Sequence, residues 1–186
     1  MDQRGIVERA QRGDHDAFAV LAGGSIARLD AAARLILRDH ELARDAVQES
    51  MVRAWRDLPT LRDVERFDAW LHRLLVNACL DLVRRRKRRA FEVELTPIHA
   101  PSTADFSGDV VQRELLDSAL RALDPERRAI VVLHFYLGMP LPDVAASLGI
   151  PLGTAKSRLH RSLAVLRTTV VGEVDTKTSL PEGRLA

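Results

Sequence analysis

Basic and hydroxyl-bearing side chains are concentrated in a short stretch near the C-terminal end of the sequence. At helical spacing, Thr154, Ser157 and Arg161 fall on one side of a helix, and Ala155 and Leu159 fall on the other. Guanidinium and hydroxyl groups donate hydrogen bonds to phosphate oxygens and to the edges of bases. The residues that we expect to contact DNA here are Thr154, Lys156, Ser157, Arg158, His160 and Arg161.

Two short helices joined by a tight turn would position this face, and residues 140–167 have that pattern. Leu141 and Leu148 belong to the apolar side of the first helix. Gly149 lies where the chain must reverse, since glycine adopts positive φ at little cost. Pro151 precedes the second helix, where its fixed φ is compatible with a helix start. The pattern predicts a helix-turn-helix whose second helix enters a DNA major groove, with an ordinary helical hairpin as the alternative.

A second group of cations ends the long helix that is predicted from about Arg66 into the nineties. The six consecutive basic residues from Arg84 to Arg89 are far more than a helix dipole requires. Such a block repels itself unless a polyanion neutralises it, so we expect a nucleic-acid contact, with an anionic membrane surface as the weaker alternative. One face of this helix carries polar residues at helical spacing: Arg73, Asn77, Asp81, Arg84 and Arg88.

A compact acidic and amide patch is predicted near the start of an earlier helix, from Glu41 to about Leu58. Asp45, Gln48 and Glu49 project away from the apolar stripe of this helix. Acidic residues near a helix N-terminus complement the helix dipole. From the helix alone, that is the better explanation of the patch.

The chain as a whole is predicted to be all-α, with two small helical domains joined by a flexible acidic linker. Residues 1–90 form the first domain. Residues 91–111 contain four acidic residues, several prolines and serines, and not one lysine or arginine. Residues 112–169 resume the helical pattern and include the helix-turn-helix, whereas residues 170–186 lose it and are expected to be disordered.

Signatures of catalysis and of metal or cofactor binding are missing from the sequence. The six histidines are scattered without zinc-ligand spacing, and there is no glycine-rich phosphate loop and no nucleophile paired with a base. The single cysteine, Cys79, excludes a disulfide framework. No apolar run is long enough to span a bilayer, and the start has no signal-peptide pattern. We therefore expect a soluble cytoplasmic protein without metal or cofactor that is not an enzyme.

Three segments, taken together and in this order, resemble the motifs of bacterial RNA polymerase sigma factors of the extracytoplasmic-function (ECF) subfamily. They are AVQESMVRAWRDL, RFDAWLHRLLVNACLDLVRRRKRR and LPDVAASLGIPLGTAKSRLHRSLAVLR. In that family such segments are the polymerase-binding helix, the helix that recognises the −10 promoter element, and the helix-turn-helix that recognises the −35 element. The resemblance extends from about Arg9 to Arg167.

The resemblance implies a protein that binds core RNA polymerase and promoter DNA and directs initiation at specific promoters. The implied contacts with the polymerase, at the clamp helices of its β′ subunit and at its β subunit, come from Asp45, Gln48, Glu49 and Arg53. The implied −10 contacts come from Arg62, Arg73, Asn77, Asp81, Arg84, Arg85 and Arg88, and the −35 contacts from the C-terminal set given above. The loop 60–66 would hold a flipped base, and the linker would follow the RNA path of the polymerase. An anti-sigma factor, a partner of many family members, is a further implied partner.

Two other classes of protein compete with this interpretation. A stand-alone helix-turn-helix regulator would bind duplex DNA without polymerase, usually as a symmetric dimer on a palindrome. An enzyme that processes nucleic acid would also use a basic helix, but no catalytic constellation supports it. One experiment would distinguish the three interpretations: whether core polymerase initiates at a defined promoter when the purified chain is present.

Overall fold

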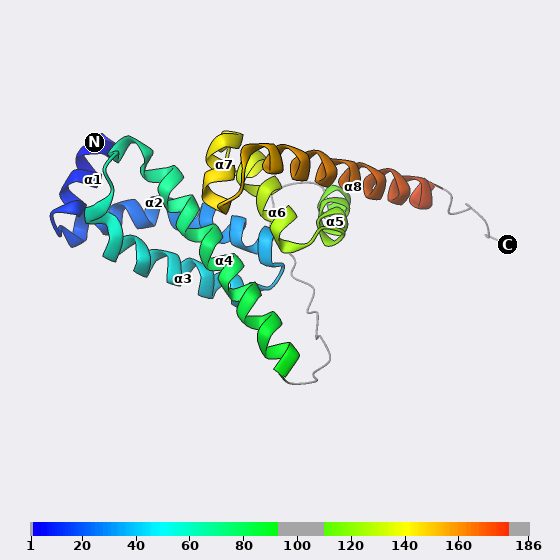
Figure 1. Cartoon of the computed structure of the whole chain (residues 1–186), viewed down its shortest axis with the longest axis horizontal. Coiled ribbons are helices and arrows are strands. Elements are labelled where there is room, and N and C mark those ends of the chain that lie inside the picture. Colours follow the sequence, from blue (N-terminus) through cyan, green and yellow to red (C-terminus); the bar gives the residue numbers. More distant parts are fainter. Residues whose placement is uncertain (1, 93–109, 179–186) are drawn as a thin grey trace.

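The computed structural model describes residues 2–92 and 110–178, and every regular element within those ranges is helical (Figure 1). The all-α prediction is therefore confirmed. The expected acidic linker, 91–111, lies outside the described residues except at its ends, where α4 finishes at Glu92 and α5 begins at Val110.

The N-terminal half consists of four α-helices and two short 3-10 turns. These are α1 (Gln3–Gln11), α2 (His15–Leu37), α3 (His40–Asp57), η1 (Leu58–Thr60), η2 (Val64–Arg66) and α4 (Phe67–Glu92). Asp2, Asp14 and Asp39 cap the first three α-helices, because each carboxylate accepts a hydrogen bond from a free N–H of the first turn. The chain reverses after α2 at Arg38, whose left-handed φ is 57°. Helices α1 and α2 are separated at Gly13, which also has a positive φ, of 89°.

Helix α2 continues without interruption through Gly23 and Gly24. A glycine costs about 1 kcal/mol in a helix interior relative to alanine, so the sequence alone left the continuity of this helix open. The turns on both sides of the pair are anchored in the core, with Ala17, Leu21 and Leu29 almost fully buried. We conclude that this burial keeps the helix intact, since packing supplies most helix stability in proteins.

Helix α4 is the central element of the N-terminal core. Phe67, Leu71 and Ala78 are buried, whereas Trp70 and Leu74 are only partly covered. The buried face of α4 also includes Leu75, Val76 and Cys79, so it extends around the helix axis away from Trp70 and Leu74. Burial raises the pKa of the Cys79 thiol to about 12, so it stays protonated and unreactive.

The C-terminal half contains the expected helix-turn-helix. Its elements are α5 (Val110–Arg121), α6 (Pro125–Val131), a π-helical turn η3 (Val132–Tyr136), α7 (Leu141–Leu148) and α8 (Leu152–Thr178). Gly149 ends α7 with a left-handed φ of 64°. The N–H of Ile150 donates to the carbonyl of Ala145 at 3.1 Å, which completes a Schellman cap. The turn between the two helices is therefore held by backbone hydrogen bonds.

Helix α8 is longer than expected. We predicted that residues 170–186 lack regular structure, whereas the helix continues to Thr178. Extending an existing helix fixes few dihedrals for each hydrogen bond gained, and no proline interrupts the sequence before Pro181. The last turns of α8 project beyond the other helices of this half (Figure 1).

The two halves pack against each other. Helix α4 contacts α7, and α2 contacts α6, so one hydrophobic cluster extends from Leu71 and Leu75 to Leu137 and Met139. The guanidinium of Arg38 donates to the backbone carbonyl of Asp117 at 2.7 Å and to its carboxylate at 3.0 Å. These apolar and polar contacts fix the orientation of one half relative to the other.

Candidate nucleic-acid and protein interfaces

A groove of about 290 Å³ lies between α3 and α4. We call it the α3–α4 groove, and its lining residues are Asp45, Gln48, Glu49, Val52 and Arg53 of α3 with Ala78, Asp81, Leu82 and Arg85 of α4. The helical spacing of 3.6 residues brings Asp45, Gln48 and Glu49 to the rim, where all three side chains are exposed. All four residues that we expected to bind polymerase therefore line one surface.

Arg53 organises the charge in this groove. Its guanidinium lies 2.8 Å from the carboxylate of Glu49 and 3.3 Å from that of Asp81. The hydrogen bond with Glu49 and the one with Asp81 raise the pKa of Arg53, against the opposing effect of burial. Asp81 is also 2.9 Å from Arg84. The sequence assigned Asp81 to DNA, and in the structure its carboxylate pairs with Arg53 across the groove as well as with Arg84 of α4.

A second groove, of about 360 Å³, lies between the two halves. We call it the interdomain groove, and it is lined by Thr60, Leu61, Arg62, Asp63, Arg66, Ala69, Trp70 and Arg73 of the first half with Met139, Asp143, Ala146 and Ser147 of the second. Asp63 is the N-cap of the 3-10 turn η2, and its side chain accepts a hydrogen bond from the N–H of Glu65 at 3.1 Å. This cap fixes the loop so that Arg62 faces the same groove as Arg73.

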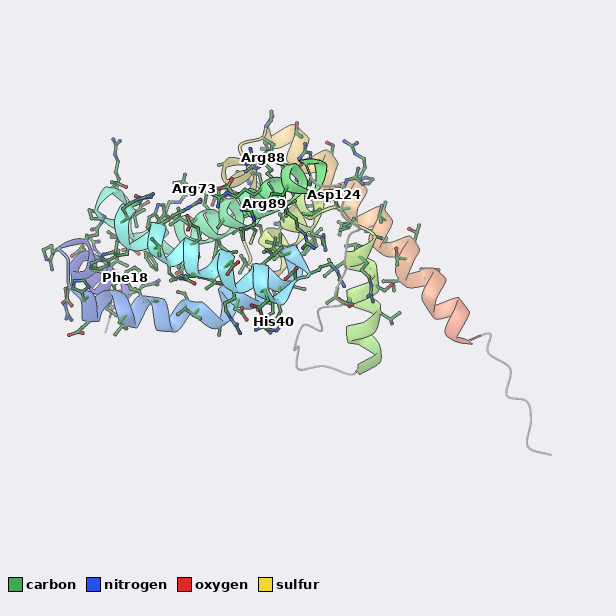
Figure 2. All side chains as sticks on the ribbon, turned by 90° about the horizontal axis from the view of Figure 1, so that it is seen from below. Phe18, His40, Arg73, Arg88, Arg89 and Asp124 are labelled. Carbon is green, nitrogen blue, oxygen red and sulfur yellow. The ribbon has the colours of Figure 1, made fainter. Side chains whose placement is uncertain are left out.

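The basic block at the end of α4 projects away from the helical core (Figure 1). Figure 2 shows Arg73, Arg88 and Arg89 spread along this helix. Arg86 pairs with Asp39, the N-cap of α3, at 3.0 Å. Arg85 and Arg88 are exposed, whereas Asn77, one turn after Arg73, is half-buried. The expected −10 residues thus follow α4 from the interdomain groove to its exposed end.

The side of α8 that we expected to contact DNA has the burial that the sequence pattern predicts. Ala155 and Ser162 are fully buried, whereas Lys156, His160 and Arg161 are exposed. Arg161 is oriented by hydrogen bonds at 3.2 Å to the backbone carbonyl and to the hydroxyl of Ser157, which is also exposed. Thr154 and Arg158 are half-buried, and Arg158 forms an ion pair with Glu126 of α6 at 3.1 Å.

Comparison with known proteins matches both halves of the chain. The family model "Sigma-70 region 2" covers residues 26–89, and "Sigma-70, region 4" covers residues 113–166. The ECF RNA polymerase sigma factor SigM of Mycobacterium tuberculosis is 35% identical over 168 residues, which are 90% of this chain and 84% of SigM. This chain belongs to the ECF sigma factor family. The family predicted from the three motifs is confirmed.

Other ECF sigma factors extend the comparison. SigE of Mycolicibacterium smegmatis is 36% identical over 139 residues, and the match spans 72% of this chain but about half, 53%, of SigE. The solved structure of the sigma factor RpoE in complex with the anti-sigma factor NepR from Bartonella quintana has a TM-score of 0.69 and 26% identity, covering 81% of this chain and 92% of that chain. The all-helical arrangement in two halves is shared with that structure.

The region 2 match of this ECF sigma factor contains all of α3 and nearly all of α4, and therefore the α3–α4 groove. The region 4 match contains α7 and the first half of α8.

Two further features concern the described residues as a whole. No helix among residues 2–92 and 110–178 is long and apolar enough to cross a membrane. In the same ranges, no three His, Cys, Asp or Glu side chains are grouped as metal ligands.

Several residues at these surfaces were not anticipated from the sequence. Val52 is 57% exposed on α3 although it is apolar, and its position outside the apolar stripe of the helix was a usable signal. Glu126, the partner of Arg158, was not among the residues expected at this surface. Asp143 lines the interdomain groove, and nothing in the local sequence around it indicated a contact with the first half.

Proposed function

We propose that this ECF sigma factor binds core RNA polymerase through the α3–α4 groove and contacts promoter DNA at two points, the −10 element through α4 and the −35 element through α8. In this proposal residues 1–90, 91–111 and 112–169 are the polymerase-binding and −10 domain, the linker and the −35 domain. The observation that carries it is the presence of three separate surfaces on the two matched regions. They are the α3–α4 groove with its acidic rim, the basic surface of α4, and the basic surface of α8.

The polymerase contact rests on the exposed rim of the α3–α4 groove. The carboxylates of Asp45 and Glu49 offer paired oxygens that match arginine side chains on a partner. Val52, one turn beyond Glu49 on α3, supplies an exposed apolar surface in the same groove, which is typical of the centre of a protein interface. Arg53 holds Glu49 in place, so the groove is ordered before the partner arrives, and less conformational entropy is lost on binding.

The −10 contact rests on the arginines of the interdomain groove and of α4. Arg62 and Arg73 line one cavity with the aromatic ring of Trp70, and these groups suit phosphate and an unstacked base. Asn77 continues this face. Arg84, Arg85 and Arg88 at the exposed end supply sequence-independent attraction to the backbone, which weakens with salt.

The −35 contact rests on the exposed face of α8. Lys156, His160 and Arg161 are free of the core, and a guanidinium donates two hydrogen bonds to the O6 and N7 of guanine in the major groove. Arg161 is already oriented by Ser157. Thr154 and Arg158 lie at the edge of this face.

The proposal includes the setting in which the protein works. The chain acts in the cytoplasm as a specificity factor and catalyses no reaction itself. The sigma factor RpoE of Bartonella quintana was solved with the anti-sigma factor NepR. We propose that an anti-sigma factor also controls this chain, competing for the surfaces that contact polymerase or DNA.

Transcription from a library of randomised templates tests this function. Core RNA polymerase with the purified chain should yield transcripts whose upstream sequences are enriched in two motifs at a fixed separation. Core enzyme alone should give no such enrichment. The proposal is overturned if the chain leaves the transcripts unchanged and binds a palindromic duplex as a dimer without polymerase.

A further inference from the structure

A further pocket, of about 310 Å³, lies among α1, α2 and the start of α4 in the N-terminal half. We call it the α1–α2–α4 pocket. Its size is at the lower end of the range of about 300–1,000 Å³ that is typical of pockets for small molecules. No residue that lines it also lines the α3–α4 groove or the interdomain groove. The pocket is therefore separate from the surfaces that we propose contact polymerase and DNA.

The walls of the α1–α2–α4 pocket are largely apolar. Leu21, Leu29 and Phe67 line it and are buried in the core. Val20 also lines it and is 61% exposed, although it is apolar. An apolar molecule in the pocket would remove the exposed valine surface from water, which is favourable.

Gly24 contributes to the open space of this pocket. Gly24 lines the pocket, whereas the adjacent Gly23 does not. A glycine inside a helix destabilises it relative to alanine. Close packing requires neither glycine, because an added Cβ would meet nothing within 4 Å at either position. The missing side chain at Gly24 therefore leaves the pocket open, at a cost to α2 that packing does not explain.

One buried polar group in the wall has no partner within the described parts of the chain. His72 lines the pocket and is 8% exposed, and its Nδ1 has no hydrogen-bond partner. Burial lowers the pKa of His72, so the imidazole is neutral at physiological pH and can donate or accept a hydrogen bond. A buried polar atom without a partner destabilises a fold. A ligand that hydrogen-bonds this imidazole would remove that cost.

Two charged side chains of the pocket indicate the charge of a ligand. Arg28 is exposed and donates to the backbone carbonyl of Tyr136 at 3.3 Å. Its other N–H groups can bind a carboxylate through paired hydrogen bonds. The carboxylate of Asp68 accepts a hydrogen bond from the side-chain amide of Gln3 at 3.0 Å, and it would repel a second negative charge on the ligand. These groups favour a ligand with a single carboxylate.

We propose that the α1–α2–α4 pocket binds a small organic acid with one carboxylate and a compact apolar body. The carboxylate pairs with Arg28, and the apolar body packs against Val20 and Phe67 in the space left by Gly24. His72 supplies a hydrogen bond from the buried wall. The proposal goes beyond the proposed function and does not depend on it, because it uses none of the residues assigned to polymerase or DNA.

Binding is measured on the full chain by NMR, with hydrocinnamate as the probe and its neutral amide as the matched control. In protein with isotope-labelled histidine, the signal of His72 is identified by its loss in His72→Gln. We expect hydrocinnamate to shift this signal with a dissociation constant on the order of 1 mM, as for a small ligand with few polar contacts. The amide and the dicarboxylate phenylsuccinate should each bind roughly fivefold more weakly. Equal affinity for the acid and the amide overturns the proposal.

Substitution of the two adjacent glycines tests the location of the site. Gly24→Leu should fill the pocket and weaken hydrocinnamate binding by about tenfold or more, whereas Gly23→Leu, the matched control, should bind like the parent. Both glycines are exposed and helical, and a Cβ at either meets no neighbour, so both variants should fold, which circular dichroism checks. Arg28→Gln should weaken binding by roughly fivefold. Equal binding by the two glycine variants overturns the proposal.

The titration of His72 provides an independent readout. The charge of Arg28 lowers the pKa of His72, and that of Asp68 raises it. A carboxylate bound at Arg28 opposes the effect of the guanidinium, so saturating hydrocinnamate should raise the pKa of His72 and the amide should not. An unchanged pKa in the presence of the acid would mean that the acid binds elsewhere, and would overturn the proposal.

Transcription separates this proposal from the proposed function. Gly24→Leu should direct promoter-specific transcription like the parent when no acid is present, because the pocket is separate from the other surfaces. Loss of hydrocinnamate binding with normal transcription in this variant supports the pocket. Failure of the parent chain to direct transcription, with hydrocinnamate binding intact, overturns the proposed function alone.

Discussion

The guanidinium of Arg53 on α3 lies 3.3 Å from the carboxylate of Asp81 on α4, and this ion pair joins residues that the sequence assigned to two different partners. Arg53 was expected to contact polymerase and Asp81 to contact the −10 element. In the structure both line the α3–α4 groove, and Arg53 also holds Glu49 at 2.8 Å. Asp81 therefore helps to orient Arg53 in the groove that we propose binds polymerase.

The first prediction concerns this ion pair. Arg53→Met and Asp81→Asn should each lower the free energy of unfolding, and a double-mutant cycle should give a coupling of about 0.5–1 kcal/mol, because the pair is partly exposed. Chemical denaturation of the four proteins measures the coupling. Additive effects of the two substitutions would show that the pair is not coupled in solution.

The second prediction concerns the acidic rim of the groove. Asp45→Ala combined with Glu49→Ala should weaken association with core RNA polymerase by about tenfold or more, because two charge-assisted hydrogen bonds are lost. Fluorescence anisotropy of the labelled protein titrated with core enzyme measures this. Glu41→Ala on the same helix should bind like the parent, since Glu41 is exposed outside the groove. Equal binding by all three proteins would contradict the assignment of the groove.

The third prediction concerns the exposed face of α8. Arg161→Ala should reduce transcription from a preferred promoter by about tenfold and relax the base preference in the −35 element, as the loss of one direct base contact does. Sequencing of transcripts from −35 libraries measures both effects. Arg12→Ala, an exposed cation in the other half, is the control for loss of charge. Unaltered −35 preference in Arg161→Ala would mean that another face of α8 contacts the bases.

The fourth prediction concerns His72, which is 8% exposed and whose Nδ1 lacks a hydrogen-bond partner. Burial lowers its pKa in the folded state, and the effect is partly opposed by Asp68 and reinforced by Arg28. The unfolded chain therefore takes up a proton first as the pH falls, so stability is full above about pH 6.5 and decreases below it.

Substitution separates this contribution from those of the other titratable groups. His72→Leu should show a smaller loss of the free energy of unfolding between pH 7 and pH 5 than the parent, measured by denaturant titration. His160→Gln, which changes an exposed histidine, should follow the parent. An identical pH dependence in His72→Leu and the parent would exclude His72 as the cause.

The fifth prediction compares two glycines in opposite conformations. Gly23→Ala should stabilise the protein by about 0.5–1 kcal/mol, because Gly23 is inside α2 and an added Cβ meets nothing within 4 Å. Gly149→Ala should destabilise it by about 1 kcal/mol, because its φ of 64° is strained for a residue with a Cβ. Thermal unfolding of both variants measures the difference. A destabilised Gly23→Ala would show that the Gly23–Gly24 turn needs its flexibility.

Local features of this protein could be predicted from the sequence because they depend on neighbours along the chain. The period of 3.6 residues predicted the buried side of α8 at Ala155 and Leu159. Gly149 predicted the turn of the helix-turn-helix. The family could also be identified, because its motifs are short segments whose order along the chain is itself informative.

Relations between segments distant in the sequence were decided by the tertiary structure alone. The period of α4 predicted which residues share a face, but not that Asp81 is directed toward Arg53, nor how far the buried face is rotated toward Cys79. Helix propensity predicted weakness at Gly23 and Gly24, and packing of the flanking turns overrode it. The contact of Arg66 with Asp143 joins residues 77 positions apart. Such a contact depends on how the two halves pack, and no local pattern in the sequence encodes it.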